Sequence, residues 1–446
     1  SAGLIYHGVA VHRNADHIRE LAGTLETKQE RTPIKLSRTG KNVIVVMLDR
    51  EVGAFFPYAL EDMPYLREQY DGFTYYANSL STGTTTTTGS PGLFGGHEYC
   101  GDAMMTDTGV PLAERHNEAL KVLPVLFWQN GYHCIVAGLP FANYSDFPDM
   151  SIFDEYPDMD TYVFERELSM DRMTVDSEWN ISSALFSYAI FKSAPYFYHD
   201  FLYNTVCYGL EQIPIEIPLE ESYSVLANLP QMTVAVDEEC GSFVEFDNNL
   251  VHEPALLQLP DYTITEKIDN TEYWAAMEDL SPMLRKLKTQ GQYHVGAAAL
   301  RLMGQWMDHL RELGVYDNTR IIIVSDHGAN NLDFYPAVWG SDIGISNWDC
   351  ILLYKDFNAS GLTVCEDFMC NADVPYLATL GGVVKEAVNP FTGKPFTTAA
   401  MQNNTVTAVL PLEWAPVKGN AFTGYVYTVK EDMREAGTWQ LMEQRY

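Results

Sequence analysis

The sequence predicts an α/β fold, a three-layer α/β/α sandwich in which helices cover both faces of a mostly parallel central sheet. Two observations support this prediction. Short, continuously apolar segments alternate along the 446 residues with longer amphipathic segments, which is the pattern of parallel strands joined by helices. Several apolar segments also end in aspartate or are followed by histidine, as strands do where an open sheet forms a site at its carboxyl edge.

Four segments predict buried strands, because their apolar residues run without the alternation of a strand that has one wet face. They are, in chain order, NVIVVMLDR (42–50), the end of LKVLPVLFWQNGYHCIVAG (120–138), GSFVEFDNN (241–249) and TRIIIVSDHG (319–328). The second begins as a helix and turns at Asn130 and Gly131, a pair typical of turns. The segment YHVGAAALRLMGQWMDHLRELG (293–314) predicts an amphipathic helix that Gly314 ends.

Three flanking segments depart from this alternation. Residues 1–40 form a lead-in with a helical part and a polar, basic part. Residues 160–235 are rich in aromatic side chains, yet too polar to span a membrane. They predict a helical cap packed on the core or, alternatively, an amphipathic surface that meets lipid. Residues 401–446 predict a C-terminal extension with a small β region, packed on the core.

The composition describes a globular, strongly acidic chain. It has 28 basic and 60 acidic side chains, a formal net charge of −32 and 46% hydrophobic residues. Such a charge disfavours nucleic acid and anionic membrane surfaces as partners, although solubility alone also explains it. The sequence contains no run of about 18 apolar residues, which a membrane-spanning helix requires, and no visible signal peptide.

The seven cysteines are scattered, without a CxxC pair. Cys365 and Cys370, in CEDFMC, are close enough in sequence to bridge across a turn, and an odd total leaves at least one free thiol. The sequence motifs of P-loops, dinucleotide-binding sites, HExxH zinc sites and GxSxG hydrolases are missing. These common cofactor and nucleophile sites are therefore not predicted.

A threonine run between glycines, NSLSTGTTTTTGSPGLFGG at residues 78–96, is unusual for a globular chain. Threonine is β-branched and stiff, so five threonines in a row, from Thr84 to Thr88, make a poor flexible spacer. The glycines on both sides bend the chain around the run. Two interpretations follow: an ordinary polar loop, or an exposed hydroxyl that is held in place as a nucleophile.

Ionisable residues follow three of the predicted strands. Asp49 ends the first, His252 comes shortly after the third, and Asp326 with His327 ends the fourth. Because sites in open α/β sheets form at the carboxyl ends of the strands, we expect these side chains to lie near one another and near a threonine hydroxyl. Oxygen and nitrogen ligands without a thiolate suit a divalent cation: Mn²⁺, Zn²⁺ or Mg²⁺.

The order of these motifs, MLD, then GTTTTTGSPGLF, HEP and SDHG, resembles the alkaline-phosphatase/sulfatase superfamily over residues 40–395. It is most similar to the lipoteichoic-acid-synthase-like and phosphoethanolamine-transferase-like branch. Those enzymes are membrane-anchored and have an extracytoplasmic catalytic domain that moves a phospho-alcohol group from a lipid donor. The resemblance implies a catalytic domain at residues 41–400, with the aromatic segment as an insertion.

The resemblance also implies roles for single residues. Asp49 matches the acidic metal ligand after the first strand, and Asp326 and His327 match the paired ligands of the family's Asp-His-Gly. His252 matches the histidine that faces the transferred phosphate. The stretch NADVPYLATLG (371–381) is similar to the one that leads to the last core helix of the family.

The nucleophile that the resemblance implies is Thr84. In the phosphoethanolamine transferases the nucleophilic threonine follows a glycine, and a Ser-x-Pro-x-x-Phe pattern comes after it. Gly83, Pro91 and Phe94 keep this spacing around Thr84. Coordination of its hydroxyl to the metal would lower the hydroxyl's pKa and so activate a weak nucleophile.

Three departures from the family narrow the expectation. No C-x-P-x-R sequence is present, which disfavours a sulfatase that uses formylglycine. No histidine follows His327, so we expect one bound ion rather than two. The stretch AGLPFANYSDFPD (137–149) lacks the His, Trp and Arg with which lipoteichoic acid synthases read glycerol phosphate, which disfavours phosphoglycerol as the group carried.

The leading hypothesis is a metal-dependent transferase of phosphoglycerol- or phosphoethanolamine-type groups that forms a phospho-threonine intermediate. The resemblance implies a phospholipid donor, a cell-surface glycan or lipid acceptor, and membrane contact through an upstream anchor outside this sequence. It places the domain outside the cytoplasm, without a nucleic-acid partner. Two alternatives stay open: a phosphodiesterase or phosphatase with water as the acceptor, and a catalytically silent binding module.

Overall fold

The structure is a computed structural model, which describes residues 34–165, 216–330 without 266, 272 and 274–286, residue 332, and residues 344–416 and 418–445. Most of the predicted lead-in and most of the predicted aromatic insertion (residues 166–215) lie outside the described residues. The chain divides into two compact units, Ser1–Thr32 with Glu165–Glu221 and Pro33–Phe164 with Ser222–Tyr446. The second unit contains the central sheet.

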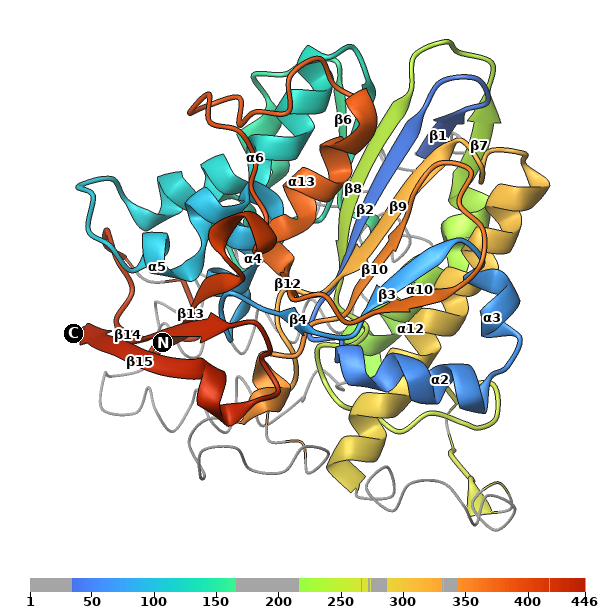
Figure 1. The fold of residues 1–446 in the computed structure, drawn as a ribbon. Coiled ribbons are helices and arrows are strands. Elements are labelled where there is room, and N and C mark those ends of the chain that lie inside the picture. Colours follow the sequence, from blue (N-terminus) through green and yellow to red (C-terminus); the bar gives the residue numbers. More distant parts are fainter. Residues whose placement is uncertain are drawn as a thin grey trace, which may run out of the picture. The chain divides into compact units, whose positions relative to one another are not determined.

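This sheet confirms the predicted α/β fold (Figure 1). Within the described residues it has eight strands. From edge to edge they are β11 (Thr363–Cys365), β3 (Phe73–Tyr76), β10 (Leu352–Lys355), β9 (Thr319–Val324), β2 (Asn42–Leu48), β8 (Ser242–Asn248), β5 (His133–Ala137) and β6 (Met159–Tyr162). The run from β9 to β6 is parallel, whereas β10 is antiparallel to both of its neighbours. All four predicted strands lie in the parallel run.

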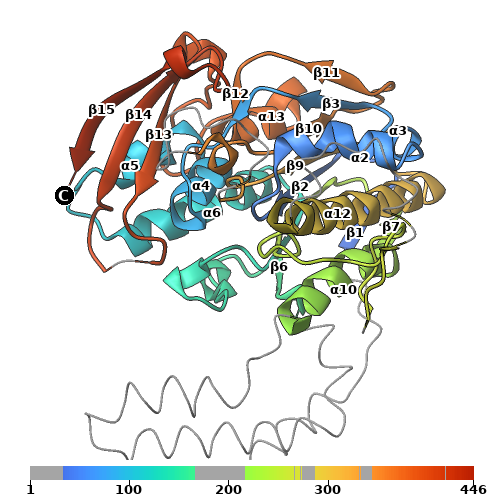
Figure 2. The same cartoon turned by 90° about the horizontal axis from the view of Figure 1, so that it is seen from below.

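Helices cover both faces of the sheet, as predicted (Figures 1 and 2). One face carries α4 (Thr86–Gly95), α6 (Leu112–Gln129) and α13 (Val374–Thr379). The other face carries α2 (Phe56–Asp62), α3 (Leu66–Gln69) and α12 (Leu287–Glu312), together with the part of α10 (Glu216–Met232) that begins at Ser222. The two helices predicted from sequence end close to left-handed glycines, Gly131 after α6 (φ 79°) and Gly314 after α12 (φ 71°). No helix in the described part of the chain is long and apolar enough to cross a membrane.

The packing explains why the central strands are continuously apolar. β2 is buried at all seven of its positions. Its side chains Val43, Val45 and Met47 belong to one hydrophobic cluster with residues of α4, α6 and α13. On the opposite face, Phe246 of β8 meets Trp306 of α12 edge to face, with ring centroids 6.0 Å apart. A strand covered on both faces has no wet side on which polar residues would be favourable.

Smaller sheets accompany the central one. The pairs β1 (Ile34–Ser37) with β7 (Thr233–Val236) and β4 (Ser79–Leu80) with β12 (Met369–Cys370) are parallel. The strands β13 (Thr405–Pro411), β14 (Gly424–Lys430) and β15 (Trp439–Arg445) form an antiparallel sheet, which is the predicted C-terminal β region. This sheet packs on buried Trp348, whose ring centroid lies 5.2 Å from that of Trp439.

Candidate metal centre and active site

The fold brings together three residues that were predicted as metal ligands. Asp49 follows β2, and Asp326 and His327 follow β9. The two strands are parallel neighbours, with Met47 opposite Val324, so their carboxyl ends meet at one edge. One ligand atom from each of the three residues lies within 4.8 Å of the other two, and all three residues are buried. A single ion is therefore within reach of all of them.

Two carboxylate oxygens in this cluster have no hydrogen-bond partner among the described residues. They are Asp49 Oδ1 and Asp326 Oδ2. His327 Nε2 lies 4.0 Å from the first and 3.5 Å from the second. Buried carboxylate oxygens without a donor are unfavourable unless a cation compensates their charge. The residues present therefore fit a divalent cation.

The ring of His327 is held in the form that binds metals. Its Nδ1 lies 2.7 Å from the carbonyl oxygen of Gly328. Because a carbonyl oxygen only accepts hydrogen bonds, Nδ1 carries the proton and donates it. Nε2 is then left to face the two carboxylates with its lone pair, which is the usual arrangement of a metal-ligating histidine.

Backbone amides hold the other oxygen of Asp326. Asp326 Oδ1 accepts from the N–H of His327 at 2.8 Å and from the N–H of Arg50 at 3.2 Å. Arg50 has φ 66°, a left-handed conformation that is unfavourable for a residue with a side chain. Such strained residues are typical of functional sites, where the surrounding structure holds them. The two amides leave Oδ2 as the oxygen that is available to an ion.

The threonine run forms the start of a helix rather than a flexible loop. Thr85 is extended (φ −139°, ψ 154°), and α4 begins at Thr86. Thr86 Oγ1 donates to Asp49 Oδ2 at 3.4 Å, so a hydroxyl at the helix N-terminus reaches the metal-ligand cluster. Thr84, which the family spacing selects, lies two residues before the helix and is buried. The geometry therefore adds Thr86 to Thr84 as a candidate nucleophile.

Glycines allow the threonine run and the ligand loop to approach each other closely. A Cβ added at Gly89 would lie 2.3 Å from the carbonyl oxygen of Asp326, and one added at Gly83 would lie 2.3 Å from Thr88 Oγ1. Both distances are well below van der Waals contact. Packing therefore requires Gly89, because a side chain there would push α4 away from the end of β9, and it requires Gly83, because a side chain there would clash with Thr88 of the same run.

Replacing Gly89 by alanine is expected to destabilise the protein by about 1–3 kcal/mol, the usual cost of overpacking. It should also weaken metal binding, because Asp326 has to shift. Urea denaturation measures the first effect, and titration of the stripped protein with Mn²⁺ measures the second. Gly437→Ala is the matched control, since an added Cβ there meets nothing within 4 Å. Unchanged stability and affinity in the Gly89 variant would contradict this packing.

Asn371, whose role no sequence pattern indicates, ties the nucleophile loop to the ligand loop. Its Nδ2 donates to the carbonyl oxygen of Asp326 at 2.7 Å, and its Oδ1 accepts from the N–H of Thr82 at 3.1 Å. The hydroxyl of Ser81 donates to the same carbonyl. The sequence offered one indirect indication of Asn371: it begins the stretch NADVPYLATLG, which does lead into a core helix, α13.

His252 lies beside the cluster and keeps its ring accessible. Its loop follows β8, the other parallel neighbour of β2, and its side chain is 46% exposed. The negative charge of Asp49 is the largest cause of a raised pKa of His252. The ring therefore binds a proton more readily than an ordinary histidine and lies within electrostatic reach of Asp49. An accessible, protonated imidazole suits a general acid.

Arg50 acts on the same loop. Its Nη1 donates to the carbonyl oxygen of His252 at 2.6 Å and lies 3.6 Å from the carboxylate of Glu253. Glu253 in turn pairs with the ring of His252, at 3.3 Å. Arg50 thus connects the loop after β2 with the loop after β8 and limits how far the His252 backbone can move.

Metal affinity is expected to fall as the pH drops through about 6. Burial, together with the Asp49 carboxylate, raises the pKa of Asp326 to about 6, so protons compete with a cation at a higher pH than for an ordinary aspartate. In the metal-free protein, the Asp326 carboxyl binds its proton more tightly in the folded state than in the unfolded state, which raises the free energy of unfolding. This stabilisation is complete below pH 3.8, the ordinary pKa of the group, and is lost as the pH rises through about 6.

Urea denaturation with and without Mn²⁺, from about pH 4 to about pH 7, measures both effects. Asp326→Asn serves as the control, because it removes the titrating group. A metal affinity that does not change with pH across this range would contradict the assignment of Asp326 as a ligand.

No protein-family model matches the sequence, and no curated protein matches it either. Solved structures do resemble the fold. A protein in the alkaline phosphatase superfamily from Vibrio parahaemolyticus is 12% identical, covering 92% of this chain and 84% of its own, with a TM-score of 0.45. A phosphonate monoester hydrolase from Silicibacter pomeroyi is 14% identical, covering 90% of this chain and 88% of its own, with a TM-score of 0.48. The lipoteichoic acid synthase LtaP from Listeria monocytogenes is 11% identical, covering 91% of this chain and 87% of its own, with a TM-score of 0.46.

Proposed function

We propose that the chain is a metal-dependent transferase that moves a phospho-alcohol group through a covalent phospho-threonine. The observation that best supports this is the hydroxyl of Thr86, 3.4 Å from a carboxylate oxygen of Asp49 at the start of α4. A divalent cation (Mn²⁺, Zn²⁺ or Mg²⁺) held by Asp49, Asp326 and His327 would lower the pKa of that hydroxyl and offset charge on the phosphoryl oxygens. The family spacing selects Thr84 instead, and the test below separates the two residues.

In the first half-reaction, the threonine Oγ attacks the phosphorus of a phosphodiester, and the bond between phosphorus and the leaving alcohol of the donor breaks. The hydroxyl proton passes to Asp49, whose Oδ2 already accepts from Thr86. His252, whose side chain is 46% exposed, donates a proton to the leaving alkoxide. The start of α4 suits the phosphoryl oxygens, because the first N–H groups of a helix point along its axis toward a bound anion.

In the second half-reaction, the hydroxyl of an acceptor attacks the phospho-threonine. His252, now neutral, takes the proton of that hydroxyl, and the threonine Oγ regains its proton from Asp49. The donor that the family resemblance implies is a phospholipid, and the acceptor is a cell-surface glycan or lipid. We accordingly place the domain outside the cytoplasm, in contact with a membrane through an upstream anchor, without a nucleic-acid partner.

A phosphodiesterase or phosphatase is the second candidate. It shares the first half-reaction and all of its residues, and it differs only in using water as the acceptor. The observation in its favour is the 46% exposure of the His252 side chain, which lets water reach the group that would activate it.

Mass spectrometry separates the candidates after the metal-loaded protein is incubated with vesicles of phosphatidylglycerol and phosphatidylethanolamine. A transferase should accumulate a modified threonine whose added mass identifies the head group, and a glycan acceptor should discharge it. A hydrolase should release soluble phospho-alcohol over many turnovers with little modified protein. If neither a protein adduct nor a released phospho-alcohol is found, both candidates are contradicted. The catalytically silent binding module is then the hypothesis that is left.

A further inference from the structure

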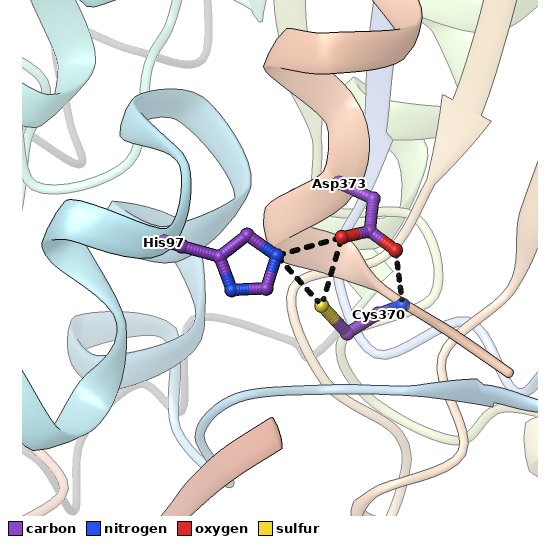
Figure 3. A group of neighbouring side chains, drawn as sticks. All are labelled: His97, Cys370 and Asp373. Atoms are coloured by element: carbon purple, nitrogen blue, oxygen red, sulfur yellow. Dashed lines mark hydrogen bonds and ion pairs between the residues drawn. The ribbon is translucent and has the colours of Figure 1, made fainter. Parts of the chain in front are cut away.

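A second group of metal-binding side chains lies outside the proposed active site (Figure 3). His97 belongs to η2 (His97–Tyr99), directly after α4, whereas Cys370 ends β12 and Asp373 ends η8 (Asn371–Asp373). One ligand atom from each lies within 4.8 Å of the other two. Cys370 and Asp373 are fully buried, and the His97 side chain is 9% exposed. We propose that His97, Cys370 and Asp373 form a zinc-binding site.

The distances within this group fit a zinc ion. Cys370 Sγ lies 3.6 Å from His97 Nε2 and 3.4 Å from Asp373 Oδ1. A tetrahedral zinc ion with bonds of about 2.0–2.3 Å separates its ligand atoms by about 3.3–3.6 Å. His97 Nε2 and Asp373 Oδ1 are closer, at 2.7 Å, and have to separate by roughly half an ångström to admit the ion. A sulfur, a nitrogen and an oxygen ligand are those that zinc prefers.

The side chains are also oriented by further contacts, as metal ligands usually are. Asp373 Oδ1 accepts from the N–H of Ala399 at 2.9 Å, and Oδ2 accepts from the N–H of Cys370 at 3.0 Å. The second ring nitrogen of His97, Nδ1, lies 3.8 Å from Cys100 Sγ. Cys100 thus contacts the nitrogen that would not bind the ion, and Nε2 points at Cys370 and Asp373 (Figure 3).

An ion at this position would join two segments that carry the active site. His97 follows the helix that starts with the threonine run. Asn371, next to Cys370, holds the carbonyl oxygen of Asp326. Zinc would therefore fix the end of α4 relative to the segment that positions the ligand loop. The site does not depend on which reaction the chain catalyses, and its thiolate distinguishes it from the cluster of Asp49, Asp326 and His327.

Cobalt substitution tests the site directly, because a cobalt–thiolate bond gives an intense near-ultraviolet charge-transfer absorption and the proposed active site contains no thiolate. The whole chain, stripped with a chelator and loaded with Co²⁺, should show this absorption. Cys370→Ser should lose it. Cys100→Ser is the matched control and should retain it, since the Cys100 sulfur contacts the other ring nitrogen.

Zinc analysis of the Asp326→Ala, His327→Ala double variant keeps this test separate from the proposed function. That variant should still bind one zinc ion per chain and show the cobalt absorption. A wild-type spectrum without the absorption, or a double variant without zinc, would show that the group is only a buried His97–Asp373 hydrogen-bonded pair. The wild-type spectrum decides the question even if Cys370→Ser fails to fold.

Discussion

Alanine at both Asp326 and His327 is expected to abolish turnover and to remove the active-site metal. These residues are two of the three proposed ligands that the structure brings together, and Asp49 alone cannot hold an ion against water. We expect kcat/KM for a chromogenic phosphodiester to fall by at least about a thousandfold, which corresponds to about 4 kcal/mol of transition-state stabilisation. Steady-state kinetics and equilibrium binding of Mn²⁺ measure the two effects.

The choice of Mn²⁺ confines this measurement to the proposed active site, because Mn²⁺ favours oxygen ligands over thiolates. Asp308→Ala, His309→Ala is the matched control, since it removes another adjacent Asp-His pair, on α12. That control should leave Mn²⁺ binding and turnover close to those of the wild type. Full Mn²⁺ occupancy in the Asp326, His327 variant would falsify the assignment of these ligands.

Thr86→Val is expected to have the second large effect. It removes the hydroxyl that donates to Asp49 Oδ2 and keeps the shape of the side chain. Formation of the phospho-threonine should stop, and turnover should fall by at least about a thousandfold. The protein should still fold, with a free energy of unfolding lowered by no more than about 1–3 kcal/mol, because the substitution creates neither a cavity nor a clash but removes a donor from a buried carboxylate. Adduct mass spectrometry and urea denaturation measure these outcomes.

Two further variants identify the nucleophile. Thr86→Ser keeps a hydroxyl at the same position and should retain the adduct, whereas Thr84→Ala should retain it only if Thr84 is not the nucleophile. Loss of the adduct in Thr84→Ala, with normal turnover in Thr86→Val, would show that the family spacing and not the helix start identifies the reactive residue. An adduct that persists in both variants would show that neither Thr84 nor Thr86 is the nucleophile.

The sequence by itself determined the fold class and which ionisable side chains follow the ends of its strands. A run of apolar residues such as Val43 to Leu48 is stable only when helices cover both of its faces, so the parallel sheet follows from local pattern. Asp49 and Asp326 end two such strands, and parallel strands place their carboxyl ends at one edge. The shared edge follows without knowing which strands are neighbours. The structure confirms the fold, and it brings Asp49, Asp326 and His327 close together because β2 and β9 are parallel neighbours.

Only the tertiary structure shows that the hydroxyl of Thr86 donates to Asp49 Oδ2. The family spacing points to Thr84, but the helix start sets the direction of each hydroxyl, and α4 begins at Thr86. The close approach of Gly89 to the carbonyl oxygen of Asp326 holds α4 against the ligand loop, and that contact joins residues far apart in the chain. Local pattern carries no information about such a distance.

The group of His97, Cys370 and Asp373 also could not be predicted from the sequence. Spacing placed Cys370 near Cys365, yet both thiols are free. They lie in different sheets, with β11 beside β3 and β12 beside β4, so Cys370 turns towards His97 instead. Periodicity and spacing report the structure of neighbouring residues. Contacts between distant segments arise only when whole strands and helices pack, and for that reason the strand-end ligands were predictable whereas this second group was not.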